Sequence, residues 1–110
     1  MRGNGEDAAT ALLRALRHRF AQFAGRFRID DLSSRAWASV TFSGARHQIA
    51  FSLEGAGAAG AADGFLARMD DDEFDLRGHI LADIALAGEE RSAAGDHVRI
   101  RIEALTVEDN

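Results

Sequence analysis

Apolar and polar residues alternate from Phe74 to Leu86, as they do in a strand with one buried face. The even positions are apolar, and the charged residues fall on odd positions. The alternation returns from Val98 to Val107, so the two stretches are predicted to form an antiparallel hairpin across the polar loop 88–96. The register that matches the two apolar faces pairs Ile84 with Ile100, Leu86 with Val98 and Asp83 with Arg101.

A helix is predicted from Glu6 to about Ala24, because apolar residues recur there at steps of three and four. Asn4 is the expected N-cap and Gly25 the expected stop. The arginines and His18 lie opposite the apolar stripe, where they form either an ordinary solvated face or a site for acidic partners or phosphate. The residues after Gly25 either extend the helix or begin an extended link, and the pattern leaves both open.

A second hairpin is predicted from Ala36 to Glu54, because its apolar positions change from even to odd along the way. A two-residue turn requires such a change, and Gly44 followed by Ala45 has the Gly-X signature of a type II′ turn. This turn gathers the apolar residues and His47 on one face. The predicted pairs on that face are Phe42 with His47, Val40 with Ile49, Ala38 with Phe51 and Ala36 with Leu53.

Between the hairpins a helix is predicted from the alanines at 58–62 to about Met69, with Phe65, Leu66 and Met69 facing the core. The glycines before it have GxGxxG spacing, but the parallel βαβ unit of a dinucleotide site has no candidate here. The acidic run 70–73 lacks the spaced ligands and glycine turn of a calcium loop. It is therefore predicted to be a solvated connector.

The order helix, hairpin, helix, hairpin predicts an α+β fold (αββαββ) with a four-stranded antiparallel sheet and two helices on one face. The 110 residues are expected to form a single domain, 1–110, frayed at 1–5 and 108–110. The sequence has no cysteine and no run of about 18 apolar residues. The first ten residues are charged and glycine-containing, unlike the apolar segment of a signal peptide, so we expect a cytoplasmic protein without a membrane span. All thirteen basic residues are arginine and alanine is frequent, which favours a GC-rich bacterial source.

Charge is divided unevenly along the chain, whose formal net charge is −5. Residues 1–46 contain eight arginines and four acidic residues, or +4, whereas residues 47–110 contain five and fourteen, or −9. The negative total argues against a general nucleic-acid binder, whose affinity rests on neutralising phosphates. Nucleic-acid binding through the arginine-rich first helix is therefore only the third functional hypothesis.

The first hypothesis concerns the sheet face turned away from the helices. That face is predicted to carry apolar residues among charged ones, and a second copy in a homodimer would cover them. A non-enzymatic domain that self-associates or binds another protein follows from this reading. The expected contact residues are Trp37, Leu81, Arg77 and Arg101.

The second hypothesis is a pocket between sheet and helices, with His47 as a candidate base or ligand. The alternative for His47 is a hydrogen-bonded histidine at the edge of the core. His79 and Asp83 are disfavoured as a catalytic pair, because four residues along a strand separate them by about 13 Å. The sequence has no HExxH, paired-histidine or GxSxG motif, so metal or nucleophilic catalysis has no motif support. We expect no metal site and no cofactor, and a non-enzymatic role is favoured over a catalytic one.

Overall fold

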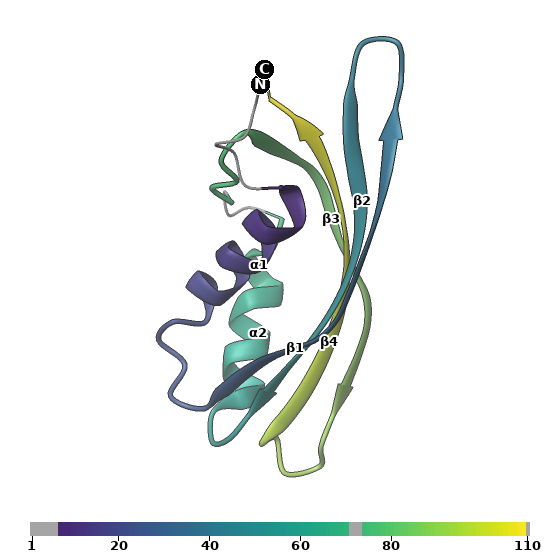
Figure 1. Ribbon diagram of the computed structural model, residues 1–110. Helices are drawn as coiled ribbons and strands as arrows, with labels where there is room; N and C mark the ends of the chain where they lie inside the picture. Colours follow the sequence, from purple (N-terminus) through teal and green to yellow (C-terminus); the bar gives the residue numbers. More distant parts are fainter. Residues whose placement is uncertain (1–6, 71–73, 110) are drawn as a thin grey trace.

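The structure is a computed structural model that describes residues 7–70 and 74–109. Its elements are α1 (Ala8–Arg19), β1 (Arg26–Ala38), β2 (Ser43–Glu54), α2 (Ala58–Arg68), β3 (His79–Arg91) and β4 (His97–Glu108). The strands form one antiparallel sheet in the order β1-β2-β4-β3, and both helices lie on the same side of it (Figure 1). The predicted α+β class with a four-stranded antiparallel sheet and two helices is confirmed. Asn4 and most of the acidic run lie outside the described residues.

The first helix is shorter than predicted. Asp7 is its N-cap and accepts a hydrogen bond from the Thr10 backbone N–H at 2.7 Å, and this bond lowers the pKa of Asp7. The helix ends at Arg19 instead of near Ala24, because Phe20 leaves the helix to stack on Phe27 of β1 with ring centroids 5.2 Å apart. Gly25 therefore does not stop the helix. A Cβ at this position would collide with the backbone oxygen of Glu54, so glycine is needed for the chain to enter the sheet.

The first hairpin is longer than predicted, and its turn lies elsewhere. The chain turns at Ser39–Phe42, and the predicted turn at Gly44 and Ala45 is wrong, because both residues belong to β2. The observed register packs apolar residues of the long β1 against the core, where they are partly buried, and this outweighs the local turn signature. Gly44 is used for close packing, since a Cβ there would collide with the Thr106 backbone. The observed partners are Ser34 with His47, Leu32 with Ile49, Ile29 with Phe51 and Phe27 with Leu53.

The second hairpin also differs in register. β3 begins at His79, continues to Arg91 and leaves a loop of only Ser92–Asp96, which the Ser92 side chain stabilises through bonds to Asp96 and the His97 N–H. The predicted pairing is wrong, because the shorter loop and two bulges shift every partner. The observed pairs are Ile84 with Ala104, Leu86 with Ile102 and Asp83 with Leu105.

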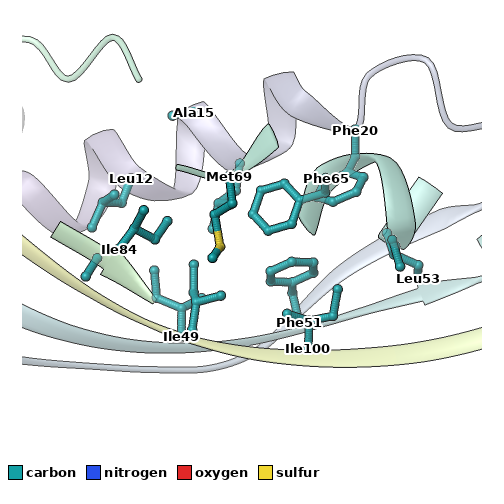
Figure 2. Packing of buried hydrophobic residues seen from close by; sticks show 14 of the residues in the cluster. Leu12, Ala15, Phe20, Ile49, Phe51, Leu53, Phe65, Met69, Ile84 and Ile100 are labelled. Carbon is teal, nitrogen blue, oxygen red and sulfur yellow. The ribbon is translucent and has the colours of Figure 1, made fainter. Parts of the chain in front are cut away.

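The core lies between the sheet and the two helices (Figure 2). Its centre is a set of four phenylalanine rings, one from the residue that follows α1 and the others from β1, β2 and α2, with centroids of contacting pairs 5.2 to 5.7 Å apart. The predicted second helix is confirmed, with Phe65 and Met69 buried. The even positions of β3 are less uniform than predicted, because Ile80 and Leu86 are exposed. The four rings belong to Phe20, Phe27, Phe51 and Phe65.

The β1–β2 hairpin projects beyond the helices at one end of the molecule (Figure 1). The structure is correspondingly elongated, with extents of 49 × 24 × 24 Å. The turn of this hairpin exposes Val40 fully and Phe42 by 58%. Neither helix of the described part is long and apolar enough to cross a membrane.

Candidate functional site

The sheet surface turned away from the helices is called the open face here. On β2, alternate residues from His47 to Leu53 point to the core and are buried, so the residues between them lie on the open face. Strand pairing then arranges the open face in rows across β1, β2, β4 and β3. The three rows nearest the projecting hairpin are Trp37, Gly44, Val107 and Ile80, then Arg35, Arg46, Leu105 and Asp83, then Ser33, Gln48, Glu103 and Ala85.

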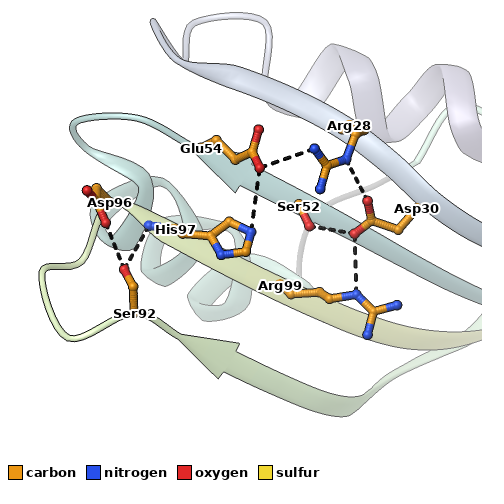
Figure 3. A network of polar contacts seen from close by, with 8 residues as sticks. All are labelled: Arg28, Asp30, Ser52, Glu54, Ser92, Asp96, His97 and Arg99. Atoms are coloured by element: carbon orange, nitrogen blue, oxygen red, sulfur yellow. Dashed lines mark hydrogen bonds and ion pairs between the residues drawn. The ribbon is translucent and has the colours of Figure 1, made fainter.

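At the other end of the open face, the charged side chains form what we call the polar network (Figure 3). Asp30 is its centre and accepts hydrogen bonds from Arg28 Nε at 2.8 Å, from Ser52 Oγ and from Arg99 Nε at 3.3 Å. Asp30 is the extra residue of a bulge in β1, which turns its carboxylate toward β2 and β4. Burial by itself would raise the pKa of Asp30, but the bonds from Ser52 and Arg28 outweigh it and keep the pKa below 3.8.

The polar network continues on both sides of Asp30. Arg28 Nη1 donates to Glu54 Oε2 at 3.1 Å, and His97 Nε2 lies 3.8 Å from the same oxygen. Arg99 Nη1 lies 3.8 Å from Glu90 Oε1 on β3. This end of the face is thus crossed by ion pairs within one chain, and Ser52 beneath them is only 1% exposed.

The end near the projecting hairpin has a different character, and we call it the apolar end. It consists of Trp37, Ile80, Leu105 and Val107 on the sheet, with Val40 and Phe42 at the turn. Ile80 is 51% exposed, while Trp37, Leu105 and Val107 are partly buried. The Trp37 Nε1–H is buried without a hydrogen-bond partner among the described residues, an arrangement that costs about 1–3 kcal/mol. Exposed apolar clusters of this kind mark interaction surfaces on soluble proteins.

The middle rows carry charge of opposite sign on the two halves of the sheet. Arg35 and Arg46 lie on β1 and β2, whereas Asp83 and Glu103 lie on β3 and β4, and all four are exposed. Below them a shallow depression of about 370 Å³ is lined in part by Asp31, Gln48, Ala50, Arg101 and Glu103.

Of the four predicted contact residues, two lie on the open face, one lies on the helix-facing side and one lies in a turn. Trp37 and Arg101 lie on the open face, and the Arg101 guanidinium lies over Gly88 of β3, where a Cβ would collide with it. Leu81 does not lie on that face. The bulge at Ala82 exchanges the faces to which the preceding residues of β3 point. Leu81 therefore pairs with buried Thr106 and packs against the core, while Ile80 lies on the open face. Arg77 is exposed in the turn that precedes β3.

His47 lies on the helix-facing side of β2 and is 2% exposed. Ser34 Oγ lies 2.7 Å from Nδ1, and Thr106 Oγ1 lies 3.0 Å from Nε2. The Thr106 hydroxyl donates to the Ala45 oxygen, so it accepts the proton of Nε2, and Nδ1 accepts the Ser34 proton. Burial lowers the pKa of His47, and nearby His79 lowers it further, so the ring is neutral near pH 7.

This geometry leaves His47 with both nitrogens occupied by side chains of β1 and β4. His79 and Asp83 lie on opposite faces of β3, since the bulge separates them, and do not form a pair. Within residues 7–70 and 74–109 no three histidine, aspartate or glutamate side chains are grouped to hold a metal ion.

Sequence reasoning missed the centre of the polar network and half of the apolar end. Asp30 gives no signal in a linear pattern, because its place depends on a bulge. Ile80 has the even parity of the residues predicted to face the core, and the predicted turn at Gly44 and Ala45 placed Val40 and Phe42 on the buried face as well. These faces depend on the bulge at Ala82 and on the position of the first turn, and no local pattern of the sequence marks either one.

No family model matches the sequence, and comparisons with curated proteins and with solved structures found no match.

Proposed function

We propose that this chain is a non-catalytic binding domain that associates with another protein subunit, in the first place a second copy of itself, through the open face. The observation that carries the proposal is the apolar end, where Trp37, Ile80, Leu105 and Val107 share one row or adjacent rows. These side chains lie beyond the part of the sheet that the polar network covers. Burying them against another protein would remove apolar surface from water, which is the main driving force of association.

The polar network also supports the proposal, because its charged side chains are already paired within the chain and need no partner subunit. Its arginines and carboxylates already make ion pairs with one another, so their partial burial is offset within the chain. Trp37, by contrast, has a buried Nε1–H without a described partner. A partner that shifts the indole or supplies an acceptor would relieve that cost.

A catalytic role for His47 has less support. A general base needs one nitrogen within reach of a substrate proton. Here Thr106 and Ser34 occupy both nitrogens, and β1 and β4 flank the ring on either side.

Sedimentation equilibrium at micromolar concentration tests the proposal. We expect a mass of twice the 11.9 kDa chain for the unmodified protein. Ile80→Ser and Trp37→Ser should each shift the equilibrium toward monomer while the circular dichroism spectrum is kept. Leu86→Ser is the matched control, because Leu86 is a similarly exposed apolar residue of β3 on the helix-facing side. A single-chain mass up to tens of micromolar would overturn the proposal.

A further inference from the structure

We infer that the second copy packs face to face on the open face about a two-fold axis parallel to the strands, so that β1 of one subunit lies over β3 of the other and β2 over β4. The inference rests on the proposed function and specifies its partner and its contacts. It follows from how charge is distributed over the rows of the open face.

The two halves of the open face have opposite charge in its exposed middle. Arg35 and Arg46 occupy the β1–β2 half, and Asp83 and Glu103 occupy the β4–β3 half at the same levels along the strands. All four residues are exposed. Both helices of the described chain lie on the other side of the sheet (Figure 1). Two copies of such a face are complementary in charge only when the β1–β2 half of one copy lies over the β4–β3 half of the other.

Closed dimers are built on a two-fold axis, and face-to-face packing with the strands of the two sheets aligned leaves two directions for it, along the strands or across them. An axis across the strands would place each half over the same half of the partner, with arginine facing arginine. An axis along the strands exchanges the halves of a sheet with the order β1-β2-β4-β3. Arg35 then lies opposite the partner's Asp83, and Gln48 lies opposite the partner's Glu103. Like-charge contacts across an interface cost several kcal/mol, so the second axis is strongly favoured.

Two further contacts fit the same axis. Trp37 at the end of its row lies opposite the partner's Ile80, which joins the apolar ends of the two subunits. Asp31 lies in the row of Ala50, Arg101 and Gly88, and the Arg101 guanidinium extends over Gly88. Asp31 therefore lies opposite the partner's Arg101. The natural twist of the sheets would cross the two sets of strands at roughly 30°, the usual angle of aligned sheet packing.

Charge reversal with mixing tests the axis. In a two-fold dimer Arg35→Glu creates two contacts between like charges, and so does Asp83→Arg. Each variant alone should dimerise about tenfold more weakly at low salt. In a mixture of the two variants, the heterodimer pairs the new glutamate with the new arginine and retains one original pair. Native mass spectrometry should therefore find mainly heterodimer, with affinity recovered to near that of the unmodified protein.

Control and contrary outcomes are distinct. Arg17→Glu, which reverses an exposed charge on α1 far from the open face, should leave dimerisation unchanged. If the unmodified protein dimerises but the mixture shows no preference for heterodimer, the axis is wrong and the proposed function stands. If the unmodified protein is a monomer at tens of micromolar, both are wrong.

Discussion

The two faces of the sheet differ in how their side chains are shielded from water. The helix-facing side buries apolar residues of β2, β3 and β4 under α1 and α2, with partly buried residues of β1 beside them. Its buried histidine, His47, has hydroxyl partners on both ring nitrogens. No helix or strand between residues 7 and 70 or between 74 and 109 covers the open face. Its polar network covers one end with ion pairs, and its apolar end leaves Ile80, Val40 and Phe42 exposed.

The difference shows what each face requires for stability. The covered face is closed within one chain, because α1 and α2 cover a core to which β2, β3 and β4 contribute buried residues (Figure 2). Partly buried residues of β1 pack against the same core. On the open face, side chains are paired within the chain only at the end where charged residues of neighbouring strands form ion pairs (Figure 3). Changes on the first face should therefore act on folding, and changes at the apolar end should act on association.

The largest expected effect comes from the covered face. Phe51 is fully buried and touches the rings of Phe20, Phe27 and Phe65. Phe51→Ala should lower the free energy of unfolding by about 3–5 kcal/mol, measured by urea denaturation. Phe42→Ala at the exposed turn is the control and should change it by less than about 0.5 kcal/mol. Similar losses for both variants would contradict the division between the faces.

An intermediate effect is expected from the centre of the polar network. Asp30→Ala removes the acceptor shared by Arg28, Ser52 and Arg99, and should cost about 2 kcal/mol of unfolding free energy. Because the folded pKa of Asp30 is below 3.8, its contribution is complete above that pH and is lost as the pH falls below it.

Asp30→Asn isolates this acid-dependent part. Urea denaturation of the unmodified protein and of Asp30→Asn at pH 7 and pH 3 should show a smaller difference at the lower pH. An unchanged difference would mean that the Asp30 carboxylate does not stabilise the fold through its charge.

The smallest effect concerns His47. Its folded pKa is below the ordinary value of 6.5, so protonation favours the unfolded chain as the pH falls below 6.5. The free energy of unfolding should therefore decrease from pH 7 to pH 5.5, by at most about 1.4 kcal/mol per pH unit. His47→Leu should remove this slope, whereas His18→Leu, on the exposed side of α1, should keep it. A slope that survives in His47→Leu belongs to other groups.

The inward face of β2 was predictable from sequence, because alternation is a local property and the predicted inward residues are all buried: His47, Ile49, Phe51 and Leu53. The position of the first turn was not. Gly44 has the right chemistry for a turn, but pairing β1 with β2 over their full length buries more apolar surface. A local signature of one glycine is weaker than the packing of a whole strand.

The site was harder to predict than the fold. Leu81 was assigned to the wrong face, because one extra residue, Ala82, reverses the parity on which the assignment depended. Trp37 kept its face under both registers, since the turn moved by a number of residues that preserved parity. Asp30 could not be found at all, because its partners lie on β2 and β4 and meet only after the sheet has formed.

The placement of the bulges has a further consequence. The extra residues of the three bulges lie on β1 and β3, which are the two edge strands of the sheet. They are Asp30, Ala82 and Ala87. A bulge interrupts the regular row of backbone donors and acceptors that an incoming strand would need. The sheet is thereby protected against growth sideways into fibrils, and an assembly formed through its face would end at two subunits.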